Sequence, residues 1–357
     1  MQTNTKTTGQ RNVALDLLRV IAIFLVLWQH SSEYYYIGNN LSLITENAYT
    51  LGFFNSLSRI CVPLFVMISG YFLLPMKTGT GAFFRKRFAR ILWPWIFFCI
   101  VYAVYYMFYR GDSLAACLLN IAHIPVNWGV EVGHLWYIYM LIGMYLLVPV
   151  LSPWVRNSSK REMQVYLGIW AATTFLPYIH LVWPLVWGEC TWNVSPALYY
   201  FTGFGGYLVL GSYVRKYGQL SVAASLALLV VGYLATALVF NARIPYASGA
   251  VEAEIPWDFC AVNVAMMTYA MFSLVSHIKI NAGSLWARLI TSISVCSYAI
   301  YLAHIMLLNF YHDLFDGSFA SILVKIPLIS VCTFVTTYVI VLLLARLPKS
   351  RYWLGVD

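Results

Sequence analysis

Charged side chains are scarce in this chain of 357 residues. Asp, Glu, Lys and Arg make up 10% of it, against about 25% in an ordinary soluble domain, while apolar residues make up 61%. A soluble globule of this size has too few charges to cover so much apolar surface. The composition therefore excludes a soluble enzyme and a disordered chain. It leaves a polytopic membrane protein with little mass outside the bilayer.

Several local signals are also missing. The seven cysteines form no CxxC pair and no metal-ligand spacing, so we expect neither a disulfide-stapled fold nor a metal. No nucleic-acid motif and no linker rich in Pro or Ser is present. No convincing internal repeat is visible, which disfavours the transporter folds that are built on repeats. No cleavage site follows the first apolar run, which predicts a retained helix rather than a signal peptide.

Long apolar runs dominate what is present. Crossing the hydrocarbon core takes about 20 apolar residues in a helix. An apolar piece at 113–124 is too short to span and is typical of an interfacial or re-entrant helix. Ten longer runs predict an all-α integral membrane protein with about ten transmembrane helices, at residues 15–37, 50–75, 88–109, 134–154, 164–184, 197–214, 219–240, 257–278, 286–311 and 319–345.

The basic residues predict the orientation in the membrane. With the N-terminus in the cytoplasm, most of the 22 Lys and Arg fall on the cytoplasmic side, and only Arg110, Arg243 and Lys325 fall outside. Both termini are therefore expected in the cytoplasm, and the formal net charge of +9 reports topology rather than nucleic-acid binding. The expected domains are a cytoplasmic N-terminal segment 1–14, a transmembrane domain 15–345 and a cytoplasmic tail 346–357.

The first span carries a polar stripe. Arg19 and His30 are 11 residues apart, which places them on one helix face with a rise of about 16 Å between them. Asp16 lies one turn before Arg19, and Glu33 lies one turn after His30. Ionisable groups at such depth are functional candidates by default. The structural alternative is an Asp16–Arg19 pair at the interface and one histidine that is hydrogen-bonded inside the bundle.

Three further arginines stand out. Arg59 lies in the second span near the depth of His30, where an arginine must pair or line a wet cavity. Arg87 and Arg90 are one turn apart at the cytoplasmic end of the third span, a spacing that suits a phosphate or pyrophosphate. The structural alternatives are an arginine that cross-links helices through carbonyl groups and an ordinary positive-inside anchor.

The ninth span adds a second buried histidine. Ser297, Tyr301 and His304 share one helix face, and His304 falls in the outer half of the membrane. A lone histidine of this kind is more often structural than functional. Two histidines and an arginine at similar depth on three spans favour a shared site. The glycines between 203 and 211 predict close helix packing.

Six motifs, in order and over nearly the whole chain, resemble those of the membrane acyltransferase-3 family. Within that family the chain is most similar to the bacterial surface-polysaccharide O-acetyltransferases. The motifs are Asp16-x-Leu-Arg19-x10-His30, Val62-Pro-Leu-Phe65…Ser69-Gly-Tyr71, Arg87-x-x-Arg90…Pro94, His134-Leu-Trp136-Tyr137, Gly203…Gly211, and Ser297-Tyr-Ala-Ile-Tyr301-Leu-x-His304.

The resemblance implies transfer of an acyl group, usually acetyl, from cytoplasmic acetyl-CoA to a carbohydrate hydroxyl, in the inner membrane of a bacterial cell. It implies that His30 is the catalytic histidine and that Arg19 is its partner in the motif. Arg87 and Arg90 would meet the donor. The motif positions of less certain role are Asp16, Ser69, His134, Trp136, Ser297, Tyr301 and His304.

We expect His30 to act as general base on an acceptor hydroxyl that arrives from outside. Glu33 would orient His30, and Arg59 would stabilise the tetrahedral oxyanion. An acyl-histidine intermediate is the alternative mechanism. The alternative function is a multi-span transporter or flippase for a glycan or small solute, coupled through buried Arg, His and Asp. The acceptor sugar and the choice between acetyl and succinyl stay open.

Overall fold

The computed structural model describes residues 11–125, 133–183, 203–319 and 321–356. Within these ranges the chain is helical and contains no strand. Eight helical units are long and apolar enough to cross a membrane, in agreement with the predicted fold class. They are α1 (Val13–Glu33), η2 with α3 (Ser56–Ile60 and Cys61–Leu73), α4 (Thr80–Tyr109), η3 with α6 (Gly133–Leu135 and Trp136–Asn157), α10 (Val222–Arg243), η7 with α12 (Ile255–Trp257 and Val262–Ser276), α13 (Leu285–Phe315) and α14 (Ile322–Leu344).

The fifth and sixth predicted runs are not single long helices. The run at 164–184 forms α7 (Lys160–Thr173) and then α8 (Leu176–Val182), because the chain turns at Thr174 and Phe175 and a proline begins α8. The run at 197–214 starts outside the described residues, and its described part forms α9 (Gly205–Tyr217). Hydropathy alone does not detect such a break. The predicted count of ten membrane crossings therefore stays a prediction.

Four short α-helices and one short 3-10 helix, η1 (Asn39–Leu41), complete the described chain. The apolar piece at 113–124 is α5 (Leu114–His123), which is too short to span, as predicted, and packs against α4. The others are α2 (Thr45–Phe54), α11 (Ala250–Ala253) and α15 (Ser350–Trp353). The C-terminal segment is docked rather than free. Its Leu354 is fully buried, and the Trp353 ring lies 5.5 Å from that of Phe97 on α4.

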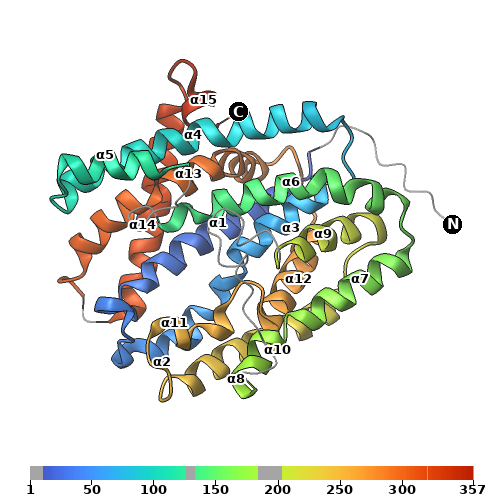
Figure 1. Ribbon diagram of the computed structural model, residues 1–357, viewed down its shortest axis with the longest axis horizontal. Helices are drawn as coiled ribbons and strands as arrows, with labels where there is room; N and C mark the ends of the chain where they lie inside the picture. Colours follow the sequence, from blue (N-terminus) through green and yellow to red (C-terminus); the bar gives the residue numbers. More distant parts are fainter. Residues whose placement is uncertain (1–10, 126–132, 184–202, 320, 357) are drawn as a thin grey trace.

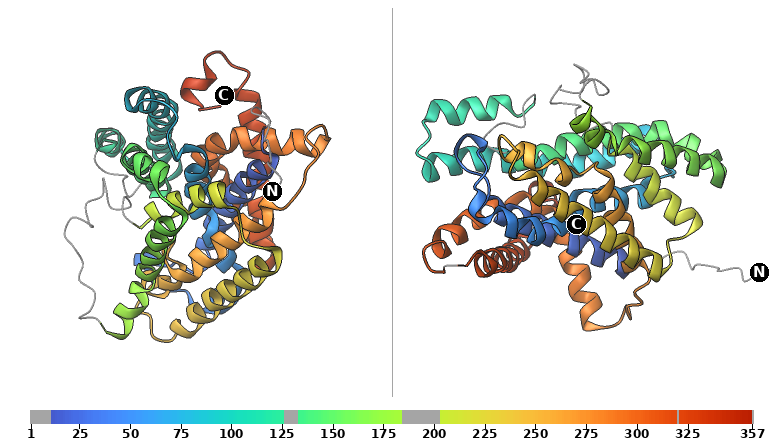
Figure 2. Two further views of the ribbon diagram at one scale, coloured as in Figure 1. Left: turned by 90° about the vertical axis from the view of Figure 1, so that its right-hand side faces the viewer. Right: turned by 90° about the horizontal axis from the view of Figure 1, so that it is seen from below.

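Helix α1 lies in the middle of the bundle, where it contacts α3, α13 and α14 (Figure 1). Asn12 starts the helix, since its side chain accepts hydrogen bonds from the backbone N–H groups of Ala14 and Leu15. Helix α10 lies at the margin of the bundle and exposes much of its apolar surface (Figure 2). Along the polar stripe of α1, Asp16 is buried, and the side chains of Arg19, His30 and Glu33 are 29%, 17% and 32% exposed.

Glycines bring α3 and α9 into backbone contact, as the sequence predicted for the stretch 203–211. A Cβ atom on Gly70 of α3 would lie 2.0 Å from the carbonyl oxygen of Leu208, and one on Gly211 of α9 would lie 2.0 Å from that of Met67. Only glycine fits such an approach, which is a common device for packing helices in membranes. The contact fixes α3, and with it the residues that α3 presents to the interior.

We predict that Gly211→Ala lowers the thermal unfolding midpoint of the purified protein, because the added methyl group would push α3 and α9 apart. Gly168→Ala on α7 is the matched control, since its Cβ would meet no atom within 4 Å. In an exposed helix this control should be neutral or stabilising by roughly 0.5–1 kcal/mol. The unfolding midpoint of each variant is measured by heating the protein in detergent and monitoring the folded fraction by size-exclusion chromatography. Equal midpoints for the two variants would contradict the packing argument.

Candidate functional site

A cavity of about 560 Å³ runs along the interior of the bundle between α1, α3, α4, α6 and α13. Most of its lining residues are three, four or seven positions from another one on the same helix, so each helix presents one face to it. On α6, for example, Tyr145, Leu141 and Tyr137 follow one another at single-turn spacing. The cavity therefore has two ends, one at the beginnings of α1 and α4 and one near the middle of the bundle.

Four arginines surround the first end, which we call the mouth: Arg11, Arg19, Arg87 and Arg90. Asp16 holds two of them, with its carboxylate 2.5 Å from Nε of Arg11 and 3.0 Å from Nη1 of Arg19. The same carboxylate accepts a hydrogen bond of 2.7 Å from the Ser294 hydroxyl of α13. Asp16 is only 1% exposed, so this buried anion joins α1 to α13 and orients the arginines.

Two further motif residues also line this cavity. Ser69 and Ser297 each direct the hydroxyl into their own helix, where they donate hydrogen bonds of 2.9 and 2.8 Å to the carbonyl groups of Phe65 and Ser294. Their hydroxyl groups therefore add little to the polar character of the cavity. The strongly polar groups of its lining are gathered at the mouth.

The second end, which we call the floor, is formed by four residues that come from four helices: Val26, Val62, Tyr137 and Tyr301. All four are at most 9% exposed. The rings of Tyr137 and Tyr301 meet edge to face with their centroids 5.3 Å apart. The Tyr301 hydroxyl donates a hydrogen bond of 2.5 Å to the carbonyl oxygen of His134. The floor is therefore packed and tied to the residues beyond it.

One helical turn beyond each floor residue lies an ionisable residue. His30 follows Val26 by four residues, and His304 follows Tyr301 by three. On the two helices that run in the opposite sense, His134 precedes Tyr137 by three residues and Arg59 precedes Val62 by three. A turn corresponds to about 5.4 Å along a helix. We refer to His30, Arg59, His134 and His304 as the polar layer.

The three histidines of the polar layer form one cluster. The ring centroids of His30 and His304 are 5.4 Å apart, those of His134 and His304 are 5.2 Å apart, and those of His30 and His134 are 6.4 Å apart. His30 and His304 therefore lie side by side, and His134 joins them from η3, the turn that precedes α6. That they form a functional site stays a prediction. No group of His, Cys, Asp or Glu within the described ranges has the arrangement of a metal site.

The hydrogen bonds of the ring nitrogens determine the tautomers. Nδ1 of His30 lies 2.7 Å from the Glu33 carboxylate, and an ionised carboxylate only accepts hydrogen bonds. In the neutral ring the proton therefore sits on Nδ1, which leaves the lone pair of Nε2 free. His304 follows the same logic, because its Nδ1 donates to the carbonyl oxygen of Tyr301 at 2.6 Å. Its Nε2 is buried and has no hydrogen-bond partner in the described part of the chain.

Arg59 belongs to a separate network beside the histidines. Its guanidinium donates a hydrogen bond of 3.1 Å to the Tyr36 hydroxyl and lies over the ring of Trp257, 4.1 Å from the ring centroid. The Tyr36 hydroxyl in turn donates to Glu254 at 2.5 Å. Burial raises the pKa of this carboxyl group, and the charge of Arg59 opposes the shift. The guanidinium Nε is buried and has no hydrogen-bond partner among the described residues. The Nε–H of Arg59 can therefore donate a hydrogen bond to a bound group.

Aromatic and polar side chains continue outward from Glu33. The ring of Tyr34 stacks on that of His312 with 3.9 Å between the centroids, and the Tyr34 hydroxyl donates to the side chain of Asn309. The amide of Asn309 donates to the Tyr105 hydroxyl at 3.2 Å. Asp313, half-exposed, accepts a hydrogen bond from a further tyrosine of α4. These groups lie at the helix ends opposite the mouth.

Several residues around the cavity were not predicted from the sequence, and one predicted motif residue, Trp136, does not line the cavity. Trp136 stacks on Phe259, 5.8 Å between centroids, and lies in neither the cavity lining nor the histidine cluster. Arg11 at the mouth resembled an ordinary anchor. The partners of Arg59, Tyr36 and Trp257, are far apart in the sequence, and no local pattern links them.

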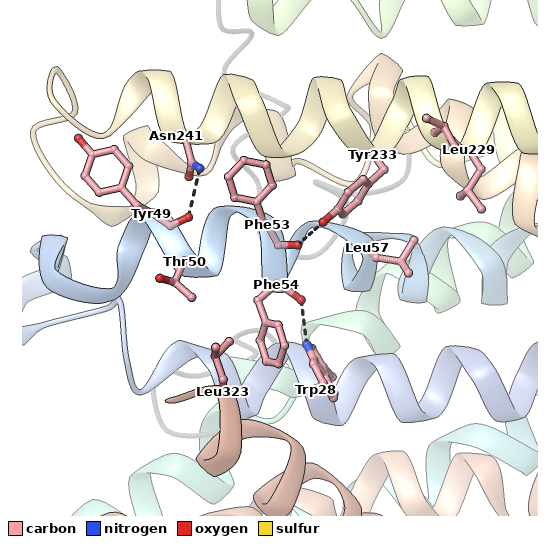
Figure 3. A pocket seen from close by; sticks show the side chains of 11 residues that line it. Trp28, Tyr49, Thr50, Phe53, Phe54, Leu57, Leu229, Tyr233, Asn241 and Leu323 are labelled. Atoms are coloured by element: carbon pink, nitrogen blue, oxygen red, sulfur yellow. Dashed lines mark hydrogen bonds between the residues drawn. The ribbon is translucent and has the colours of Figure 1, made fainter. Parts of the chain in front are cut away.

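A larger cavity, of about 980 Å³, lies between α2 and α10 beside the ends of α1 and α14 (Figure 3). Its lining is almost entirely apolar. The side chains of Trp28, Tyr233 and Asn241 donate hydrogen bonds to backbone carbonyl groups of α2 and so join α1 and α10 to that helix. None of the predicted site residues lines it. The chemistry-bearing residues therefore belong to the smaller cavity.

Comparison with known proteins identifies the family of the chain. The family described as acyltransferase domain matches residues 12–346. No curated protein and no solved structure shows a significant match. The matched region contains the polar layer and the whole cavity lining except Arg11. The chain therefore belongs to the acyltransferase-3 family of membrane acyltransferases.

Proposed function

We propose that this protein transfers an acetyl group from cytoplasmic acetyl-CoA to a hydroxyl group of a cell-surface or lipid-linked carbohydrate. In this proposal it is a multi-pass protein of the bacterial inner membrane. It is of the surface-polysaccharide O-acetyltransferase type that includes the O-acetyltransferase of enterobacterial common antigen. Family membership supports the acyltransferase reaction. The donor, the acceptor and the residue roles are proposals that follow from the arrangement of the site.

The order of residues along the cavity carries the proposal. Four arginines at the mouth suit the phosphates of coenzyme A, since guanidinium groups bind phosphate through paired hydrogen bonds. The basic loops predict that this end faces the cytoplasm. The long, thin pantetheine arm fits a cavity that runs inward from there. Its thioester would arrive at the floor, one turn from His30.

His30 has the features of a general base. The Glu33 carboxylate holds Nδ1–H, which leaves the lone pair of Nε2 to take the proton of an acceptor hydroxyl. The hydroxyl oxygen attacks the thioester carbonyl, and an oxyanion forms. When the intermediate collapses, the C–S bond breaks and the CoA thiolate receives the proton from His30. In this scheme the unused Nε–H of Arg59 is the donor for the oxyanion.

The acceptor approaches from the other side of the polar layer. Aromatic faces and side-chain carboxyl and amide groups of the kind gathered around Tyr34, Asn309 and Asp313 bind sugars through stacking and hydrogen bonds. The donor and the acceptor would then reach His30 from opposite ends of the bundle. Neither substrate has to cross the membrane as a whole.

We predict that His30→Ala abolishes O-acetylation, with a loss of at least about 100-fold, because the general base is removed. Mass spectrometry of surface glycans from cells that express each variant measures the modification. His123→Ala on α5 is the control, since this histidine lies outside the polar layer. The His30 variant should still bind acetyl-CoA, and near-normal O-acetylation by it would exclude His30 as the base.

We predict that Arg87→Ala and Arg90→Ala each weaken acetyl-CoA binding about tenfold or more, through the loss of one charged phosphate contact. Arg85→Ala is the matched control, because Arg85 lies on the same helix but does not line this cavity. Binding of radiolabelled acetyl-CoA to purified protein in nanodiscs gives the three affinities. Absence of saturable binding to the unmodified protein would favour a transporter over an enzyme.

A further inference from the structure

The floor lies between the donor cavity and the polar layer. A thioester presented to His30 must place its acyl group at the level of Val26, Val62, Tyr137 and Tyr301. We propose that these four residues form a size and charge filter that admits a short neutral acyl group, acetyl, and rejects longer or acidic ones. This inference rests on the proposed acyl-CoA donor and selects among the acyl groups that such a donor carries.

The floor is held too firmly to yield to a larger group. The hydroxyl of Tyr301 is tied to the backbone of His134, and the Tyr137 ring is flanked by those of Tyr301 and Phe65 at 5.3 and 6.2 Å. Val26 and Val62 are β-branched and are almost completely buried. Close-packed interiors accommodate an added methylene only by forcing side chains or backbone to shift.

The distribution of charge along the cavity also favours a neutral acyl group over an acidic one. Among the described lining residues, every basic side chain lies at the mouth and none lies at the floor. The carboxylate of a succinyl group would therefore enter an apolar end without a cation to pair with. Arg59 lies one turn deeper, and its unused Nε–H is the donor assigned to the oxyanion, so it is not available for a second carboxylate. An acidic acyl group is costly to bury there, because an unpaired charge loses its hydration.

The test compares the binding of free CoA, acetyl-CoA, propionyl-CoA, butyryl-CoA and succinyl-CoA to the purified full-length protein in nanodiscs. One methylene in an apolar pocket changes discrimination by about 10–200-fold. We expect the unmodified protein to bind acetyl-CoA at least about tenfold more tightly than propionyl-CoA. We expect butyryl-CoA and succinyl-CoA to bind no better than propionyl-CoA.

Smaller side chains at the floor should shift the binding preference from acetyl-CoA toward longer acyl-CoAs. Val26→Ala and Val62→Ala each remove two methyl groups and should raise the affinity for propionyl-CoA relative to acetyl-CoA by about tenfold. Tyr137→Leu should extend the gain to butyryl-CoA. Tyr145→Leu is the matched control, since it makes the same change on the same face of α6, two turns nearer the mouth. It should alter the binding of all acyl-CoAs by the same factor.

The outcomes separate this inference from the proposed function. If the unmodified protein binds acetyl-CoA but the floor variants keep its acyl preference, the filter is wrong and the donor assignment stands. Equal shifts in the floor variants and in Tyr145→Leu would also overturn the filter. Tight succinyl-CoA binding would overturn its charge component. If no CoA compound binds at all, the donor assignment itself fails, and the filter fails with it.

Discussion

The cost of an ionisable side chain inside a membrane governs the structure of this protein. A charge there is tolerated only where another group of the bundle pairs with it. Both ends of the α1 stripe obey this constraint: Asp16 anchors Arg19 at the mouth, and Glu33 holds His30 near the middle of the bundle. The buried Asp16 also binds Ser294 of α13. The pairs that make the charges tolerable thus also fix the positions of the helices around the cavity.

The same constraint produces the layered order of the site. Helices that cross side by side bring residues of equal depth together, and each of four helices contributes one residue to the floor and one to the polar layer beyond it. The close packing of α3 against α9 at Gly70 and Gly211 fixes the position of α3 within this arrangement. Four arginines surround the mouth, valine and tyrosine side chains form the floor, and three histidines with Arg59 lie beyond it. A thioester donor matches this sequence of environments in chemical character.

Contacts within one helix could be predicted from the sequence, because the helical period alone fixes which residues share a face. The Asp16–Arg19 pair and the His30–Glu33 pair are both present at hydrogen-bond distance. Contacts between helices could not be predicted in detail. Tyr36 comes from the segment after α1 and Trp257 from η7, and they meet Arg59 only when the bundle assembles.

The most direct test of this account is a cryo-EM structure of the protein in a nanodisc with a non-hydrolysable analogue of acetyl-CoA. We expect density for the phosphates among the four arginines of the mouth and a pantetheine arm along the cavity. We also expect the carbonyl of the analogue to lie at the floor, on the side facing His30, close to the reactive distance of about 3–3.5 Å from the position of an acceptor oxygen. An analogue bound outside this cavity, or one that leaves the floor unreached, would contradict it.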